Sequence, residues 1–361
     1  MALKGALRTI DVSGSYHDMG FRLGSTYEDI ERDRLQLLKK SLHVRKIGWE
    51  KALATSKKYE KFAEEFDPEF MEFVRGYAEG SGVRFHEVFA HFCVHERGFC
   101  TDVMVNGKVT RDGSVISAHT EDWSVPSENH LVVVRLKPKK GPEILATTLG
   151  GLEITCGINS HGLSVTGNSL YPNDQRVGIP KIFVARKILM CDNIADALAA
   201  SLPPKRGSSY NQNLCHCSGE MFCAEGSATD FFPLYSPNGY LVHTNHYLAP
   251  SMLKYETLFD NDSGKSKSPI GGISSLIRYH RALNLITSQL GNVTVDSLKR
   301  ILEDHVGYPN SICRHADMRS SEEDRSKTIY GLVMDVTNLK MHVCPSNPCD
   351  GKWHELSIKK D

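Results

Sequence analysis

The sequence lacks an excess of either charge. Its 361 residues include 43 lysines and arginines and 43 aspartates and glutamates, so the formal net charge is zero. Proteins that bind nucleic acid or anionic membrane surfaces through charge usually carry a basic excess. We therefore expect neither nucleic acid nor a membrane among the partners of this chain.

Long apolar runs, internal repeats and low-complexity tracts are missing as well. No run approaches the roughly 20 apolar residues that span a bilayer, and the first eight residues contain no apolar core of a signal peptide. The last residues, 358–361, carry no peroxisomal signal. These absences predict a cytoplasmic protein, in which the ten cysteines would be reduced thiols and not a disulfide framework.

Asparagine is absent from the first 95 residues, where apolar residues recur at helical spacing through 19–42 and 62–94. From residue 100 onward, short apolar runs between turn residues predict strands, first at 101–105 and 114–118. Asn106-Gly107 predicts a two-residue hairpin turn between them. Further strands are expected at 131–136, 143–148, 152–158, 163–166, 230–234, 239–243, 329–334 and 339–343, and further helices at 181–190, 193–200, 275–288 and 295–305. Helices, a block of strands, helices and a final pair of strands indicate a layered α+β fold.

Cys100 is the most informative residue of the chain. It opens a strand as Cys100-Thr101, and the next strand ends at Glu121-Asp122-Trp123. This layout is typical of an enzyme that cuts its own backbone and then uses the new N-terminal cysteine as a nucleophile. The freed α-amine, with a pKa of about 7.7–8, would serve as the base. For a cysteine taken alone, a buried and inert thiol is the commoner reading, so the hypothesis depends on sequence context.

Four further stretches supply that context, at residues 120–123, 243–246, 308–314 and 345–349. Together with Cys100-Thr101 they resemble the acyl-coenzyme A:6-aminopenicillanate (isopenicillin N) acyltransferase family, which includes the β-alanyl-dopamine and carcinine hydrolases. The resemblance covers most of residues 10–350. It implies the four-layer αββα fold of the N-terminal-nucleophile hydrolases, with an N-terminal helical segment. It also implies autoproteolysis into a helical chain, 1–99, and a catalytic chain, 100–361, which together form one structural domain.

The resemblance assigns catalytic roles to three residues. Cys100 matches the self-processing nucleophile, which places the cleavage site between Phe99 and Cys100. Asp122 matches an aspartate that would hold the new ammonium group, and Asn245 matches an asparagine that would donate a hydrogen bond to the oxyanion. Without the resemblance, Asp122 and Asn245 would be read as turn residues at the ends of strands.

Three more residues are expected to bind substrate. Asn168 matches a pocket asparagine, and Arg325 falls where the family has an arginine near the substrate carboxylate, although an exposed arginine in a charged loop is the alternative. Thr120 stands where the family often has asparagine, which bears on the choice of substrate. A second departure is Phe99, because the family usually has glycine there to ease a strained scissile turn.

The implied activity is that of an amidohydrolase or acyltransferase that forms a thioester on Cys100. The expected substrate is a small N-acyl amine of the aminoacyl or β-alanyl type, and the expected macromolecular partner is the cleaved N-terminal fragment. No cofactor and no metal are expected, although acyl-coenzyme A would be a co-substrate of a transferase. A homo-oligomer is compatible with the sequence.

Other readings stay open on the sequence alone. One is a binding protein of the same fold that is never processed, for which Phe99 is the supporting feature. Another is a metal site at Cys215, Cys217 and Cys223, although their Cys-x-Cys-x5-Cys spacing matches no recognised zinc pattern. Arg278 and Arg281 could share a helix face beside the nucleophile or form a solvated face. His243 and His246 are expected to be structural, since an N-terminal nucleophile needs no histidine.

Overall fold

Two β-sheets form the centre of the molecule, a computed structural model that describes residues 7–94, 98–259 and 270–359. The first, sheet A, has eight strands in the order β1-β4-β5-β6-β7-β8-β9-β10. Its strands are β1 (Thr9–Gly14), β4 (Leu131–Pro138), β5 (Ile144–Leu149), β6 (Glu153–Asn159), β7 (Leu163–Ser169), β8 (Tyr210–His216), β9 (Met221–Gly226) and β10 (Phe231–Leu234). Neighbouring strands are antiparallel except β1, which pairs parallel with β4. The first strand of the chain therefore joins a sheet that is otherwise built after residue 100.

The second sheet, sheet B, has six strands in the order β11-β2-β3-β12-β13-β14 and is antiparallel throughout. Its strands are β2 (Phe99–Val105), β3 (Ile116–Ser124), β11 (Tyr240–His243), β12 (Ser326–Asp335), β13 (Lys340–Pro345) and β14 (His354–Ser357). Strand β2, which contains Cys100, lies between β11 and β3 and has a neighbour on each side.

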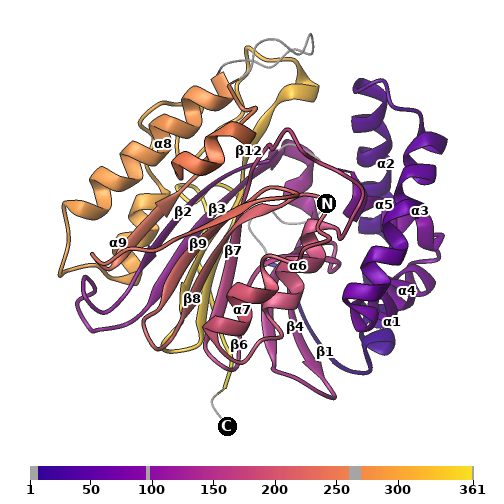
Figure 1. Cartoon of the computed structure of the whole chain (residues 1–361), viewed down its shortest axis with the longest axis horizontal. Coiled ribbons are helices and arrows are strands. Elements are labelled where there is room, and N and C mark those ends of the chain that lie inside the picture. The colour runs from indigo at the N-terminus through magenta and orange to yellow at the C-terminus, as the bar shows by residue number, and fades with distance from the viewer. Residues whose placement is uncertain (1–6, 95–97, 260–269, 360–361) are drawn as a thin grey trace.

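Helices cover the outer face of each sheet (Figure 1). Five come from the N-terminal segment: α1 (Tyr16–Thr26), α2 (Glu28–Val44), α3 (Trp49–Phe66), α4 (Pro68–Ser81) and α5 (Phe85–Cys93). The others are α6 (Lys181–Ile188), α7 (Ile194–Ala200), α8 (Ile270–Thr287) and α9 (Val295–Leu302). Short 3₁₀ turns occur at Val125–His130, Pro250–Tyr255 and Glu322–Asp324.

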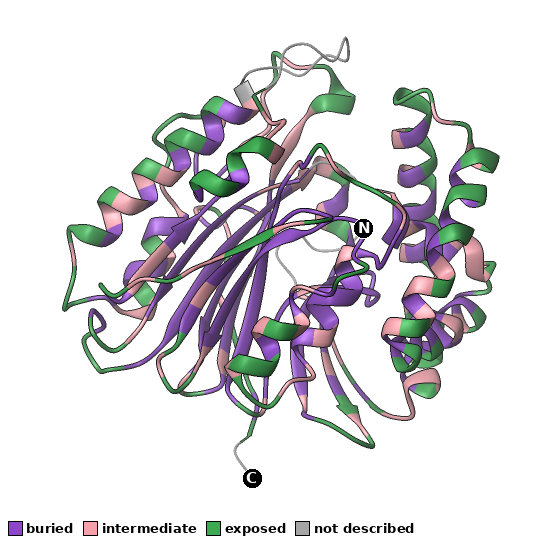
Figure 2. Cartoon of the chain, in the orientation of Figure 1, coloured by how far each residue is buried: buried purple, intermediate pink, exposed green. Residues whose placement is uncertain are grey.

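Three apolar clusters establish the layer order. One joins residues of the N-terminal helices, α6 and α7 to one face of sheet A. A second lies between the sheets, with Leu145 and Ile158 from sheet A and Leu332 and Met341 from sheet B. A third joins the other face of sheet B to α8 and α9. The central strands are accordingly buried, while the edge strands β1, β10 and β14 and the outward faces of the helices are largely exposed or half-buried (Figure 2). The layers are helix, sheet, sheet and helix, which confirms the predicted αββα fold.

Most of the predicted elements are present, with three corrections. Residues 1–99 are not wholly helical, because β1 lies among them. Strands β8, β9 and β14 were not predicted, and the Tyr-Asn-Gln-Asn sequence of β8 reads as polar although these side chains are buried. The turn at Asn106 exists, but residues 106–115 separate β2 from β3, and Val105 pairs with Ile116. No helix in the described ranges combines the length and apolar character needed to cross a bilayer.

Candidate active site

Cys100 is the second residue of β2, and its position in the sheet determines which side chains surround it. Across the β2–β3 pair, Cys100 is opposite Glu121 and Phe99 is opposite Asp122. Paired residues in antiparallel strands point to the same face of a sheet, and successive residues point to opposite faces. The thiol and Glu121 therefore face the space between the sheets, whereas Phe99 and Asp122 face the layer of α8.

The backbone of Cys100 is held from both ends. Its N–H donates to Oδ1 of Asn245 at 3.0 Å. Its carbonyl accepts a hydrogen bond from the guanidinium of Arg278, which also donates to Oδ1 of Asn245 at 2.8 Å. Arg278 projects from α8 and is fully buried, and this burial, with nearby Arg314, lowers its pKa to about 10. Asn245 and Arg278 thus fix the residue that would become the new N-terminus.

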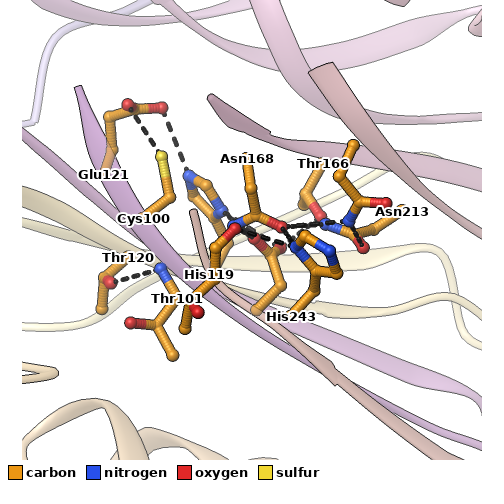
Figure 3. A network of polar contacts seen from close by, with 12 residues as sticks. Cys100, Thr101, His119, Thr120, Glu121, Thr166, Asn168, Asn213 and His243 are labelled. Carbon is orange, nitrogen blue, oxygen red and sulfur yellow. Dashed lines mark hydrogen bonds and ion pairs between the residues drawn. The ribbon is translucent and has the colours of Figure 1, made fainter. Parts of the chain in front are cut away.

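A chain of buried polar groups begins at the thiol (Figure 3). The Cys100 Sγ lies 3.5 Å from Oε1 of Glu121. The other carboxylate oxygen of Glu121 is 3.2 Å from Nε2 of His119, and Nδ1 of that imidazole is 3.0 Å from Asp102. Asp102 in turn accepts hydrogen bonds from Thr166 and Asn168. A thiol, a carboxylate, an imidazole and a second carboxylate are therefore connected through hydrogen bonds in the interior.

Burial and neighbouring charges determine which of these hydrogen-bonded groups carry a proton. Burial raises the pKa of the Cys100 thiol well above its usual range, and the Glu121 carboxylate adds to the effect. The intact chain therefore holds a protonated thiol. For His119, burial acts to lower the pKa, but its neighbours, first of all the Asp102 carboxylate, raise the pKa well above the usual value. The imidazole is thus charged between two carboxylates, and Glu121 is the acceptor next to the thiol.

On the opposite face, the ring of Phe99 lies close to two guanidinium groups. The Arg314 guanidinium is 4.6 Å from the ring centroid and that of Arg278 is 5.9 Å away. Asp122 is buried beside them, with its carboxylate 3.3 Å from Nε of Arg314 and 2.6 Å from the Thr328 hydroxyl. Burial raises the pKa of Asp122, against the opposing effect of Arg314 and Arg278.

A small pocket lies on the inter-sheet side of Cys100. Its lining includes Cys100, Glu121, Trp123, Thr147, Tyr210 and Tyr330. An adjoining pocket shares Trp123 and Tyr210 with it and is lined on its far side by residues of the N-terminal helices, among them His91 and Phe92. Both halves of the predicted cleavage product therefore contribute to the space next to the thiol.

Comparison with known proteins bears directly on this arrangement. Residues 109–350, about two thirds of the chain, match the family described as acyl-coenzyme A:6-aminopenicillanic acid acyl-transferase. The chain belongs to this family. The matched residues begin after Cys100, so membership rests on β3 and the later elements and leaves the nucleophile to be argued from geometry. No curated protein was found to match the sequence.

Solved structures offer distant likenesses to this acyl-transferase family member. A conjugated bile acid hydrolase from Clostridium perfringens, as the C2A mutant, has 12% sequence identity and a TM-score of 0.45, covering 72% of this chain and 97% of its own. Penicillin V acylase from Agrobacterium tumefaciens has 13% identity and a TM-score of 0.42, covering 72% of this chain and 86% of its own. The fold assignment above rests on the packing of the layers and not on these likenesses.

The structure brings three of the predicted site residues together at β2. Cys100 and Asn245 are in contact, but Asn245 turns its oxygen to Cys100 and its NH₂ to the Ser169 carbonyl, 3.1 Å away. In the intact chain it therefore accepts from Cys100 and is not placed as the predicted oxyanion donor. Asp122 is on the other face from the thiol, so the predicted contact with an ammonium group requires the cleaved chain.

The three predicted substrate-binding residues lie elsewhere. Asn168 is inside the polar network, where Asn211 and Asn213 donate to its oxygen, and it is not part of the pocket lining. Thr120 uses its hydroxyl to accept the Thr101 N–H. Arg325 donates to carbonyls within its own loop, those of Ser320 and Met318. The arginine that contacts Cys100 is Arg278, and Arg314 contacts the neighbouring Asp122 and Phe99.

The alternative metal site at Cys215, Cys217 and Cys223 is not formed. Cys215 and Cys223 are buried in the core between the sheets, while Cys217 is exposed in a turn. Among the described residues the three sulfurs do not form a metal-binding cluster. His243 and His246 are buried and hydrogen-bonded, to Glu225 and Ser275 respectively, which is consistent with structural roles.

Sequence reasoning missed Glu121, although it lies inside the Glu121-Asp122-Trp123 stretch. The alternation of side chains along a strand could have identified it, because only one of the adjacent residues Glu121 and Asp122 can share a face with Cys100. The register of β2 against β3 decides which one does. The predicted two-residue turn at Asn106 gave the wrong register, because residues 106–115 separate the two strands and Val105 pairs with Ile116. Arg278 was recognised only as a candidate, since a helix face alone cannot show what it packs against.

Proposed function

We propose that this protein is a self-processing cysteine amidohydrolase or acyltransferase whose nucleophile is Cys100. The observation that carries the proposal is the position of Cys100: its thiol faces a pocket and a carboxylate, while its nitrogen is held by Asn245. An N-terminal nucleophile needs these two groups of one residue placed separately, the sulfur toward substrate and the nitrogen toward a fixed partner.

The first reaction is cleavage of the Phe99–Cys100 bond. Glu121 accepts the thiol proton, and the sulfur attacks the carbonyl carbon of Phe99. The C–N bond breaks, the nitrogen of Cys100 takes a proton and becomes the α-amine, and Phe99 is left as a thioester on the sulfur. Water then hydrolyses the thioester, which leaves a carboxylate on Phe99 and restores the thiol. Phe99 has an extended backbone in register with Asp122, a conformation open to any residue, and this supports cleavage at a position without glycine.

The mature enzyme repeats the same chemistry on a substrate. The α-amine, with an unperturbed pKa of about 7.7–8, takes the proton of the thiol. The sulfur attacks the acyl carbon of a small N-acyl amine, the C–N bond breaks, and the amine leaves with a proton. The acyl group stays on Cys100 as a thioester until water or a second amine removes it. Arg278 holds Cys100 and Asn245 in place through this cycle.

The substrate class we propose is an aminoacyl or β-alanyl amide, with hydrolysis as the main outcome because water is always present. Transfer from acyl-coenzyme A is the alternative, in keeping with the name of the family. A panel of acyl amines, incubated with and without acyl-coenzyme A, separates the two. Product that forms only with the thioester donor would establish transfer and contradict hydrolysis.

N-terminal sequencing of the purified protein tests the nucleophile. We expect a large fragment that begins at Cys100, and we expect Cys100→Ala to remain intact and inactive. Cys217→Ser is the matched control, because Cys217 is an exposed thiol outside the pocket, and it should be cleaved normally. An active protein that remains one polypeptide, or a Cys100→Ala variant with full activity, would refute the proposal.

A second candidate is a binding protein of this fold that is never processed. The contacts of the Phe99 ring with Arg278 and Arg314 favour it, since these contacts stabilise the uncleaved chain. The same sequencing experiment decides between them. Intact, catalytically inert wild-type protein supports the binding protein.

A further inference from the structure

Four potential metal ligands converge at one point outside the Cys100 pocket. His305, Cys313 and His315 come from the segment between α9 and β12, and Cys349 comes from the segment after β13. The two Sγ atoms are 3.6 Å apart. Nε2 of His315 is 3.7 Å from the sulfur of Cys313, 3.6 Å from that of Cys349 and 3.1 Å from Nε2 of His305. All four ligand atoms lie within 4.8 Å of one another.

Four of the six separations match the edges of a tetrahedral zinc site, and the other two, from His305 to the sulfurs, are within 4.8 Å. Zinc binds sulfur at about 2.3 Å and histidine nitrogen at about 2.0–2.1 Å, so the edges of the tetrahedron are about 3.8 Å between sulfurs, 3.6 Å between sulfur and nitrogen and 3.3 Å between nitrogens. Each of the four distances above agrees with the corresponding edge to within about 0.2 Å.

Hydrogen bonding alone does not account for the cluster. Nε2 of His315 faces three atoms, the two sulfurs and Nε2 of His305. A neutral imidazole nitrogen offers either one N–H or one lone pair, and it therefore satisfies one of these neighbours well. A cation at the centre satisfies all four groups, and two thiolates would neutralise the charge of Zn²⁺.

We propose that His305, Cys313, His315 and Cys349 bind one Zn²⁺ as a structural site. Four protein ligands close the coordination sphere, which distinguishes a structural site from a catalytic one that keeps a position open. One of the four ligands also has a hydrogen bond from a residue outside the cluster. The side-chain NH₂ of Asn347 donates to the sulfur of Cys313 at 3.5 Å, the kind of second hydrogen bond that orients a metal ligand.

The site would fasten a residue of the active centre. Arg314 lies between two of the ligands in sequence, and its carbonyl accepts from Asn347 at 2.7 Å. Its guanidinium reaches Asp122 and the Phe99 ring on the far side. Zinc would join the loop that carries Arg314 to the chain after β13 and so keep this arginine in position. This inference does not depend on the chemistry proposed for Cys100.

Metal binding by the full-length protein tests the inference. The reduced protein is freed of metal with a chelator and titrated with Zn²⁺, and separately with Co²⁺, whose absorption reports tetrahedral geometry and thiolate ligands. We expect one equivalent of either metal, with thiolate-to-cobalt charge-transfer absorption. The variants His305→Gln and Cys349→Ser should lose tight binding, and Cys349→Ser should also weaken the charge-transfer band.

Two controls lie outside the cluster: Cys217→Ser removes an exposed thiol, and His161→Gln removes a surface histidine. Both should bind metal as the wild type does. His305 is exposed, so His305→Gln should fold, which circular dichroism checks. No uptake by folded wild-type protein, or uptake unchanged in both ligand variants, would overturn the site. The site would also be overturned if the purified protein contains a Cys313–Cys349 disulfide and still binds no metal after the disulfide is reduced.

Discussion

Glu121 is the residue at which the thiol of Cys100 meets a chain of buried charges. Its carboxylate also accepts hydrogen bonds from Trp123 at 2.6 Å and from Tyr330 at 3.3 Å. These donors hold the carboxylate beside the sulfur without taking away its ability to accept a proton. At this scale the site differs from an isolated cysteine, because a carboxylate lies beside the thiol in the intact chain.

Replacing this base should slow self-processing. Glu121→Gln keeps the shape but cannot accept a proton, and general-base catalysis contributes about 10²–10⁴-fold. We expect Phe99–Cys100 cleavage to slow by about 10²-fold or more, measured as the appearance of the large fragment on a denaturing gel. Glu128→Gln, which alters only the partner of Lys327, should process at the wild-type rate. Equal rates in both variants would rule out Glu121 as the base.

The buried histidines predict a pH dependence of stability. Burial lowers the pKa of His246 to about 3, with the charges of His243 and Arg278 adding to the effect. Its unfolded value is about 6.5, so the unfolded state binds the proton more readily between these two values. The stabilising contribution of neutral His246 is therefore complete above about pH 6.5 and is lost as the pH falls toward 3.

Urea unfolding at pH 7, 6 and 5 measures this contribution. A single such histidine makes the free energy of unfolding fall by up to about 1.4 kcal/mol per pH unit. His246→Gln should be less stable than wild type at pH 7, because the bond to Ser275 changes, but its stability should fall less steeply with pH. His161→Gln should keep the wild-type slope. A slope that is the same in all three proteins would show that His246 does not titrate as expected.

At the scale of elements, two helices of the N-terminal segment are in contact through their backbones. Gly20 and Gly24 of α1 face α4, and Gly76 and Gly80 of α4 face α1. A Cβ at Gly20 would lie 2.0 Å from the Phe73 carbonyl oxygen, and one at Gly76 would lie 2.1 Å from that of His17. The Gly-x-x-x-Gly spacing in each helix thus fixes how closely the two can approach.

A methyl group at this crossing should destabilise the fold. Gly76→Ala improves helix propensity by about 1 kcal/mol, but the clash is with backbone, which cannot rotate away. Overpacking typically costs about 1–3 kcal/mol, so we expect a net loss of stability on urea unfolding. Gly48→Ala is the control, because nothing lies within 4 Å of its Cβ position. If Gly76→Ala proves more stable than wild type, the close approach is wrong.

The sequence predicted those strands and helices that have a clearly apolar pattern. The strands from 131 to 166 were predicted because short apolar runs alternate with turn residues, and they correspond to β4–β7. Strand β8 escaped because Asn211 and Asn213 are buried to complete a polar network, a demand that only the neighbouring strands create. The zinc ligands escaped for a similar reason: Cys349 is 34 residues from His315, and no short cysteine pair marks the site.

The residues of the proposed site divide in the same way. Cys100 and Asn245 could be found because each carries a local motif at a strand end. Which face Asp122 or Glu121 occupies depends on the register of β2 against β3, and which arginine reaches the site depends on how a helix and a loop fold over sheet B. Local sequence contains neither fact, so Arg325 was named as a substrate-binding candidate, whereas the arginines that contact Cys100 and Asp122 are Arg278 and Arg314.

At the scale of the whole molecule, the proposed cleavage divides a chain whose two parts share one interior. Strand β1 pairs with β4 across the division, and the cluster on the outer face of sheet A contains residues from both parts. Buried ion pairs cross the division as well: Arg34 contacts Glu153, and Asp67 contacts Arg186 at 2.5 Å. Cutting one peptide bond removes none of these contacts.

We therefore expect fragments 1–99 and 100–361 to remain together after cleavage and to elute as one species in size-exclusion chromatography without denaturant. Arg34→Met should weaken the association, because it removes the arginine that pairs with buried Glu31 and Glu153, and breaking a buried pair costs about 3–5 kcal/mol. Arg32→Met is the control, since Arg32 makes only an exposed pair with Glu28, worth about 0–1 kcal/mol. Urea unfolding measures the loss of stability in Arg34→Met whether or not the chain is cleaved. The contribution of the ion pair can therefore be measured separately from cleavage of the Phe99–Cys100 bond. Wild-type fragments that separate on simple dilution would show that the two parts do not form one domain.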